Sequence, residues 1–210
     1  MTKIHLIVVL SFMIEKINTR REFMSNIIDG VDYGPLAALV GTWKGDKGMD
    51  IAPEPDGKEE NPFYETIMFE AIGDVTNAES QTLAVLRYHQ VVSRKSDDQV
   101  FHNETGYWGW DSKTDVITQS LTIPRGVCVL AGGKPNMKGH VTVLDVQAAV
   151  DNKDWGIIQS PFMQDNARTN EFYHNITIEG DTMSYFETMV LDIYGKTFEH
   201  TDGNTLSRSN

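Results

Sequence analysis

Gly41-Thr42-Trp43-Lys44-Gly45 opens the first predicted strand and brings a large aromatic side chain to its start. Gly41 allows a tight turn into the strand, and Gly45 allows the strand to break or bulge. A flat, bulky ring at this place suits the closed end of a β-barrel. Arg208, near the end of the chain, carries a planar guanidinium that can lie over an indole ring. The sequence therefore predicts that Trp43 and Arg208 meet and close a barrel.

Short β-type segments, separated by turn residues at regular spacing, fill most of the remaining chain. The spacing predicts an all-β fold, either an antiparallel sandwich or an up-and-down barrel. About ten strands are enough for a barrel that holds one small ligand, and we expect an antiparallel up-and-down barrel like those of lipocalins and fatty-acid-binding proteins. Pro35–Val40 predicts a short helix before the first strand, and Ala52–Pro62 predicts a polar loop after it. Gly132-Gly133 predicts a further turn. The predicted strands are Phe63–Glu70, Leu83–Val92, Val100–Trp110, Val116–Ile123, Val127–Leu130, Val141–Val146, Ile157–Gln159, Thr169–Ile178, Met183–Ile193 and a last strand that ends at Arg208.

Composition narrows the class of partner. The chain has 210 residues, which suits one main domain, and its formal net charge of −12 disfavours nucleic acid as a partner. Cys128 is the single cysteine, which excludes an intramolecular disulfide and suits a reducing, cytoplasmic location. The sequence contains no Gly-x-Ser-x-Gly, Cys-x-x-Cys or His-Glu-x-x-His motif, so several common catalytic chemistries are set aside.

Residues 1–32 differ from the rest and are expected to be an N-terminal extension to a barrel domain at 33–210. The apolar run Ile4–Ile14 is too short to span a bilayer, so no stable membrane span is expected. It is not followed by the small-residue cleavage site of a signal peptide. A translation start at Met24, or a loosely packed N-terminal helix, is favoured over export, although export directed by residues 1–23 stays open.

Leu36-x-x-Leu39-x-Gly41-Thr-Trp43-x-Gly45 resembles the opening of the nitrobindins, which are haem-binding β-barrels related to the C-terminal domain of a THAP-type human protein. The resemblance extends from about Tyr33 to the C-terminus, and loops such as Ala52–Gly57 are similar to those of a bacterial branch. It implies haem b as cofactor, small nitrogen oxides as ligands, nitric oxide binding, and isomerisation of peroxynitrite to nitrate. Whether this chain turns over a substrate stays open.

His200 is the candidate proximal ligand of the haem iron. A neutral imidazole is a natural axial ligand, and its other nitrogen is usually held by a carboxylate or carbonyl. Asp202 and Glu199 are the carboxylates nearest in sequence. In nitrobindins the proximal histidine lies shortly before a terminal arginine, and His200 has that place relative to Arg208. From the residue alone, a histidine that packs at a strand end and bonds a backbone carbonyl is the alternative.

His102 and Arg125 are the further candidates for the cofactor site. Phe101-His102-Asn-Glu104-Thr-Gly106 resembles the family strand His-x-Glu-x-Gly, which implies a distal position for His102 without a bond to iron. Its alternative is a His–Glu pair that stabilises the sheet. Arg125, in Ile123-Pro-Arg125-Gly126, is placed by the resemblance near the haem, where it could bond a propionate.

The other histidines carry weaker signals. His89 suits either the barrel mouth or the surface, whereas His140 and His174 are expected at the surface. Phe101, Tyr107, Trp108 and Trp110 are expected in the core, where a haem pocket would also use them.

A second functional class stays open at this stage, because the same architecture serves carriers of fatty acids and other small apolar ligands without iron. An inward-facing His200 beside a slot wide enough for a porphyrin would favour haem. An Arg–Tyr clamp for a carboxylate inside the barrel would favour a carrier.

Overall fold

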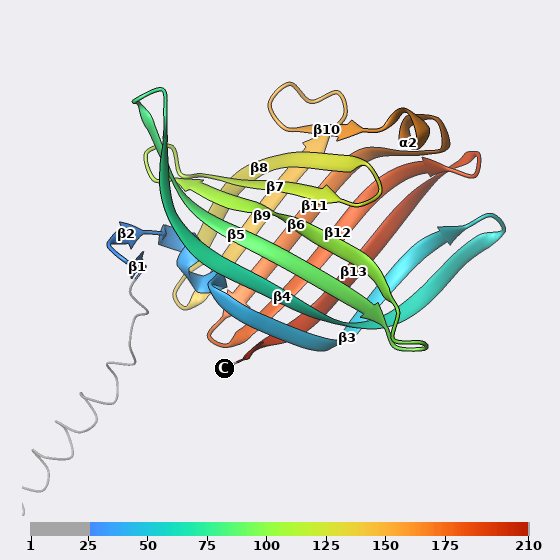
Figure 1. Cartoon of the computed structure of the whole chain (residues 1–210), viewed down its shortest axis with the longest axis horizontal. Coiled ribbons are helices and arrows are strands. Elements are labelled where there is room, and N and C mark those ends of the chain that lie inside the picture. The colour runs from blue at the N-terminus through green and yellow to red at the C-terminus, as the bar shows by residue number, and fades with distance from the viewer. Residues whose placement is uncertain (1–25, 210) are drawn as a thin grey trace, which may run out of the picture.

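Ten antiparallel strands form a closed barrel in the computed structural model, which describes residues 26–209 of the chain (Figure 1). Each strand pairs with its neighbour, and the pairings β13–β3 and β8–β9 complete the ring. An eleventh strand, β10 (Gly156–Gln159), pairs with β8 outside the ring. The predicted all-β barrel of about ten strands is confirmed. In order around the ring the strands are β3 (Gly41–Glu54), β4 (Gly57–Asn77), β5 (Gln81–Arg94), β6 (Val100–Asp111), β7 (Val116–Ile123), β8 (Val127–Lys138), β9 (Val141–Ala149), β11 (Ala167–Glu179), β12 (Thr182–Ile193) and β13 (Lys196–Ser209).

Short elements lie at both ends of the barrel. The strands β1 (Ile27–Ile28) and β2 (Val31–Asp32) form a small hairpin, and the 3-10 helix η1 (Gly34–Leu39) follows it with a proline in its first turn. Figure 1 shows this group at one end and the helix α2 (Pro161–Asn166) at the other. The predicted short helix before the first strand is therefore present. No helix within residues 26–209 has the length and apolar character needed to cross a bilayer.

Trp43 and Arg208 meet at the end of the barrel that η1 covers. The indole is fully buried, and its Nε1 donates a hydrogen bond of 2.7 Å to the carbonyl oxygen of Leu39. The Cζ atom of Arg208 lies 4.1 Å from the centre of the Trp43 ring. The same guanidinium donates to the carbonyl oxygens of Ala38, at 3.0 Å, and Val40. Since the last carbonyls of a helix lack partners within it, Arg208 ties η1 to the final strand.

The two glycines beside Trp43 have steric roles. Gly41 has a φ of +123°, a conformation that side chains with a Cβ rarely adopt, and a Cβ there would lie 3.1 Å from Nη1 of Arg208. Gly45 stands where β3 bulges between residues 45 and 48, and a Cβ there would lie 2.7 Å from Nδ2 of Asn204. Both glycines thus allow the last strand to approach the first.

Two predicted irregular segments are strands, so those predictions are wrong. The segment 52–62 is not a loop: β3 and β4 continue through it and are joined by Pro55 and Asp56 alone. Its outer part is exposed on both faces, so it lacks the apolar alternation that marks a strand over a core. Gly132-Gly133 is not a turn, because β8 runs straight through it. A Cβ on Gly133 would collide with the backbone of Asp145 on β9, so the glycine allows the two strands to approach.

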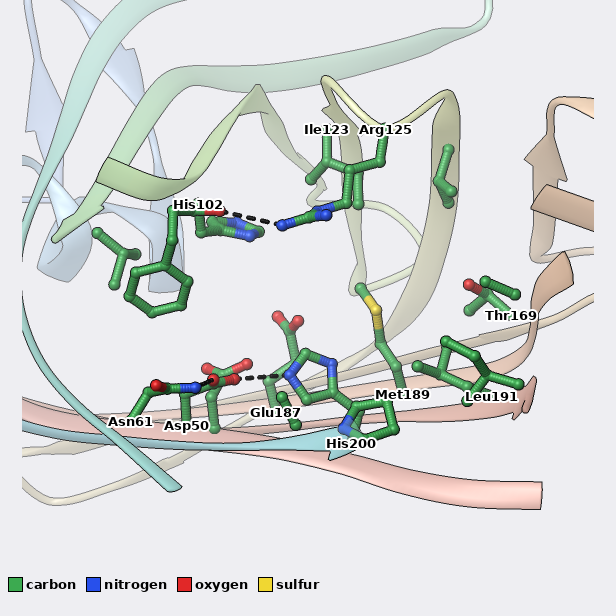
Figure 2. A pocket seen from close by; sticks show the side chains of 18 of the residues that line it. Asp50, Asn61, His102, Ile123, Arg125, Thr169, Glu187, Met189, Leu191 and His200 are labelled. Carbon is green, nitrogen blue, oxygen red and sulfur yellow. Dashed lines mark hydrogen bonds and ion pairs between the residues drawn. The ribbon is translucent and has the colours of Figure 1, made fainter. Parts of the chain in front are cut away.

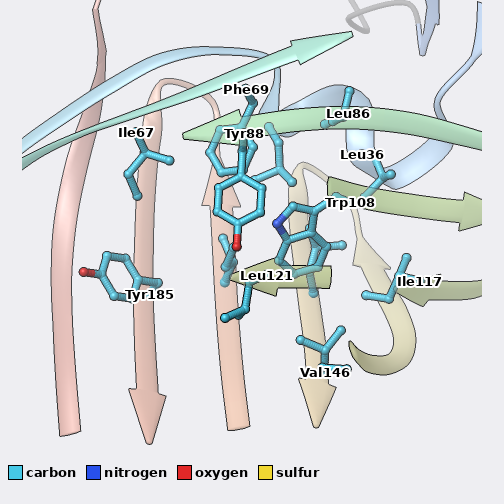
Figure 3. Packing of buried hydrophobic residues seen from close by; sticks show 14 of the residues in the cluster. Leu36, Ile67, Phe69, Leu86, Tyr88, Trp108, Ile117, Leu121, Val146 and Tyr185 are labelled. Atoms are coloured by element: carbon cyan, nitrogen blue, oxygen red, sulfur yellow. The ribbon is translucent and has the colours of Figure 1, made fainter. Parts of the chain in front are cut away.

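The core fills the half of the barrel next to η1. Figure 3 shows Phe69, Tyr88 and Trp108, from three successive strands, packed inside the barrel with Leu36 of η1 nearby. The rings of Phe69 and Tyr88 are stacked with centroids 5.7 Å apart. Because side chains of one strand alternate between its two faces, every second residue of these strands points inward. The packed half leaves room for a ligand in the half next to α2.

Candidate functional site

A cavity of about 310 Å³ lies in the open half of the barrel (Figure 2). This volume is at the small end of the range for ligand pockets, roughly 300–1,000 Å³. Much of its wall is apolar, and the apolar side chains include Phe63, Val92, Phe101, Ile123, Val127, Met189 and Leu191. Six of the polar and charged side chains lie in two groups on opposite sides. We call Asp50, Glu187, His200 and Asp202 the floor, and His102 with Arg125 the roof (Figure 2).

His200 lines the cavity from β13, and its ring is held by a carboxylate across the sheet. Its Nε2 lies 2.6 Å from Oδ1 of Asp50 on β3. Asp50 is 5% exposed, and its other oxygen accepts a hydrogen bond of 3.0 Å from Nδ2 of Asn61. Nδ1 of His200 makes no hydrogen bond within the described residues. One ring nitrogen is therefore fixed and the other is left for a ligand, as in histidines that bind metals.

Asp50 is the carboxylate partner of His200, whereas the sequence pointed to Asp202 or Glu199. Glu199 precedes His200 and is exposed, because adjacent residues of a strand point to opposite faces. Asp202 does face the cavity and acts on His200 through its charge. The register of β13 against β3 places Asp50 directly beside Asp202. The true partner therefore comes from a strand 150 residues away.

Burial and mutual repulsion govern the charges of the floor. Burial raises the pKa of Asp202 to about 6, although the neighbouring His200 and His102 act to lower it. Burial, and next the charge of Asp202, also raise the pKa of Glu187 well above its ordinary value. Burial alone would lower the pKa of His200, but the hydrogen bond to Asp50 and the charge of Asp202 outweigh it and raise the pKa. The floor thus favours positive charge.

The floor also contains a group of possible metal ligands. In the part of the chain that the structure describes, ligand atoms of Asp50, His200 and Asp202 lie within 4.8 Å of one another. One imidazole and two carboxylates are donors that borderline divalent ions accept. These three side chains suit either a metal ion that is part of a larger cofactor or a metal ion bound on its own.

His102 and Arg125 form the roof, so the structure brings all three predicted cofactor-site residues to one cavity. Nε2 of His102 lies 3.4 Å from Oε2 of the buried Glu104, which is the His–Glu pair that the sequence left open. Nη2 of Arg125 donates a hydrogen bond of 3.2 Å to the carbonyl oxygen of Phe101. His102 both pairs with Glu104 and lines the cavity, so a place in the cofactor site and a His–Glu pair are compatible interpretations of this residue.

Arg94 also lines the cavity and was missed from the sequence. Its Cζ lies 5.4 Å from the centre of the Phe101 ring, and its Nη1 bonds Oδ2 of Asp97 at 3.1 Å. Its Nε is buried and has no hydrogen-bond partner in residues 26–209. A buried donor without a partner is costly, so an anionic group of a ligand would be stabilised here. The strand was predicted to end at Val92, but alternation continued by two residues would have placed Arg94 on the inner face.

The remaining candidates lie outside the cavity lining. His89 is exposed, with Nε2 2.9 Å from Oδ1 of Asn103, and His140 is exposed in the turn after β8. Tyr107 is half exposed rather than in the core, because it alternates with the buried Trp108. His174, predicted at the surface, is buried beneath the cavity, where Nδ1 lies 3.0 Å from Oε1 of Gln119.

The closed antiparallel barrel, the cavity inside it and the imidazole that Asp50 holds at its wall indicate a protein that binds a small ligand within the barrel. The family model of the THAP4-like, heme-binding beta-barrel domain matches residues 32–208, so the chain belongs to that family. The family assignment made from the sequence is thereby confirmed. The crystal structure of Rv2717c from M. tuberculosis is similar in fold, with a TM-score of 0.64 and 22% sequence identity over 83% of this chain and 95% of that one. A comparison with curated proteins gives no match.

The residues of the cavity fit a haem. Nδ1 of His200 offers an imidazole nitrogen, which is the commonest protein ligand for haem iron. The apolar walls suit the porphyrin face, and the unpartnered Nε of Arg94 suits a propionate. Arg125 offers a second cation for the same purpose.

Proposed function

We propose that this protein binds haem b through His200 and acts on reactive nitrogen species, by binding nitric oxide and converting peroxynitrite to nitrate. The observation that carries the proposal is the His200 ring. Asp50 holds its Nε2 at 2.6 Å, while its Nδ1 makes no hydrogen bond within residues 26–209 and lies beside a cavity with largely apolar walls. Membership of a haem-binding family supports the choice of haem. The nitrogen-oxide chemistry follows from the resemblance to nitrobindins.

Different residues would bind the iron and the propionates of the cofactor. His200 would bind the iron, with Asp50 fixing the ring orientation and raising the basicity of the ligand. Arg94 and Arg125 would pair with the propionates. When bound, haem iron supplies a centre that binds nitric oxide and rearranges peroxynitrite. The apolar walls, Phe101 and Ile123 among them, would exclude water and hold small products near the site until they recombine.

A carrier of fatty acids is the second class that the sequence left open, and the floor disfavours it. A carboxylate head group placed beside His200, on the floor, would lie near Asp50 and Asp202. Like charges at such distances repel strongly in a poorly solvated site. A haem would pair its propionates with Arg94 and Arg125 and would be held at its iron by His200, so the cavity offers partners for both parts of the group.

Peroxynitrite decay tests the proposed activity. Protein loaded with ferric haem should accelerate the decay, raise the yield of nitrate and suppress nitration of added phenol, whereas haem-free protein should do none of these. Free haem at the same concentration is the control for chemistry outside the pocket. Equal decay rates with loaded and haem-free protein would refute the isomerase activity and leave a haem-binding protein.

A further inference from the structure

A row of polar side chains, joined by one ion-pair contact and then by hydrogen bonds, runs from the roof of the cavity into the core. It begins at His102, whose Nε2 lies 3.4 Å from Oε2 of Glu104, and Glu104 bonds the hydroxyl of Tyr88 through its other oxygen. That hydroxyl lies 3.0 Å from Nε2 of Gln119, and Oε1 of Gln119 lies 3.0 Å from Nδ1 of His174. We call these five residues the buried polar row. All but His102 are more than nine-tenths buried.

Donor and acceptor chemistry fixes the protons in the buried polar row. The amide nitrogen of Gln119 can only donate, so the Tyr88 oxygen accepts from it and gives its own proton to Glu104. Burial, and next the charge of Glu104, raise the pKa of Tyr88 far above its ordinary value, so the hydroxyl keeps that proton. Glu104 is therefore an acceptor on both oxygens and takes the Nε2–H of His102. Because an amide such as Gln119 does not relay protons readily, the row orients groups rather than conducting protons.

His102 consequently presents its second nitrogen, Nδ1, on the side of the ring away from Glu104. The charged and titratable groups that act on it are Glu104 on β6, Asp202 and His200 on β13, and Arg125 between β7 and β8. Burial and Arg125 lower the pKa of His102, but the bond to Glu104 and the charges of Glu104 and Asp202 outweigh them and raise it. A protonated ring donates from Nδ1, so the roof gains a cationic donor.

The charges on the two sides of the cavity differ in sign. The floor carries the carboxylates of Asp50 and Asp202, whereas the roof carries His102 and Arg125. Figure 2 shows Asp50 on one side of the cavity and His102 with Arg125 on the other. A small anion in the cavity would be repelled by the floor carboxylates and attracted by the roof. Without Glu104, the roof would lose the group that orients His102 and stabilises its charge.

We propose that Glu104 is a positioning residue, which holds His102 as a hydrogen-bond donor toward a small inorganic anion bound opposite His200. The inference rests on the proposed function where the anion is a ligand of haem iron. It adds a ligand class, small anions in preference to neutral molecules of similar size. Tyr88 and Gln119 act behind Glu104 by holding its carboxylate in place.

The first test uses haem-free protein, so it does not depend on the proposed function. The ring of His102 is titrated by NMR in the wild type, in Glu104→Gln and in Tyr88→Phe, which keeps the ring but removes the hydroxyl. The midpoint for His102 should fall by about one pH unit in Glu104→Gln and by less in Tyr88→Phe. Glu70→Gln, which removes a carboxylate paired with Arg87 on the outer surface, is the matched control and should leave the midpoint unchanged.

The second test uses protein loaded with ferric haem and compares azide, an anion, with nitric oxide, a neutral molecule. Glu104→Gln and His102→Ala should each weaken azide binding about tenfold, the value of one charged hydrogen bond, and change nitric oxide binding less than twofold. Azide affinity of the wild type should fall as the pH rises through the His102 midpoint measured by NMR, and the fall should come at lower pH in Glu104→Gln. An unchanged His102 midpoint in Glu104→Gln, or equal losses for azide and nitric oxide, would overturn the inference. Failure of the wild type to bind haem would overturn the proposed function, and the first test would still decide the role of Glu104.

Discussion

His174 should make the stability of this protein depend on pH in a direction that its surroundings fix. The side chain lies on β11, is 7% exposed, and gives its Nδ1 proton to Oε1 of Gln119 at 3.0 Å. Its Nε2 is buried without a hydrogen-bond partner in the described part of the chain. Burial lowers the pKa of His174 to about 4, from 6.5 in an unfolded chain. The folded protein thus holds this ring neutral over a range in which the unfolded chain takes up a proton.

The size of the effect follows from that range. Stability from a lowered histidine pKa is fully present above pH 6.5 and is lost as the pH falls toward 4. At about 1.4 kcal/mol for each pH unit, the loss over this range is about 3 kcal/mol. Other buried groups also titrate here: burial raises the pKa of Glu65 to about 7, which favours the folded state as the pH falls from 7 to 4.5. The contribution of His174 is therefore seen in the difference between two proteins that share these groups.

The assay is urea denaturation of the wild type and His174→Gln at pH 7.5, 6.5, 5.5 and 4.5. Relative to the wild type, the variant should gain about 3 kcal/mol in free energy of unfolding between the highest and the lowest pH. His140→Gln, at an exposed turn, controls for the removal of an imidazole from the chain. A difference between wild type and His174→Gln that stays constant within about 0.5 kcal/mol would refute the assignment of a neutral buried ring.

Three further substitutions test other contacts. Arg208→Lys should lower the free energy of unfolding by about 2–4 kcal/mol in urea denaturation, because lysine cannot both cover Trp43 and bond two carbonyls of η1; a loss below about 0.5 kcal/mol would contradict this closure. Gly133→Ala should cost about 3 kcal/mol or prevent folding, whereas Gly156→Ala, where a Cβ meets open space, should cost less than about 1 kcal/mol by the same measurement; equal costs would contradict the close approach of β8 and β9. Arg94→Gln should weaken haem binding about tenfold in an absorbance titration and leave the Soret position unchanged; unchanged affinity would exclude a propionate contact.

Local patterns made the fold predictable from the sequence. The motif around Trp43 and the position of Arg208 indicated a closed end, and period-two alternation indicated most of the strands. The predictions failed where both faces of a strand are exposed, as in the outer part of the segment 52–62, because no alternation is then required. They also failed at Gly132-Gly133, where the glycines serve a close approach between strands rather than a turn.

The site was predictable only where a residue carries its own signal. His200, His102 and Arg125 were found because their neighbours in sequence resemble family motifs, and all three line the cavity. Asp50 was missed because its contact with His200 depends on the register of two strands that are far apart in sequence. His174 could have been placed correctly, since alternation puts it on the same face as the apolar Phe172 and Ile176.

Titration with ferric haem tests the central claim most directly. The wild type should develop a Soret band that saturates at about one haem for each chain, because His200, held by Asp50, faces one cavity of the barrel. His200→Ala should lose this band or weaken haem binding greatly, whereas His102→Ala, on the opposite side, should keep haem and alter its spectrum. If His200→Ala binds haem with the affinity and spectrum of the wild type, His200 is not the ligand of the iron and the account of the site is contradicted.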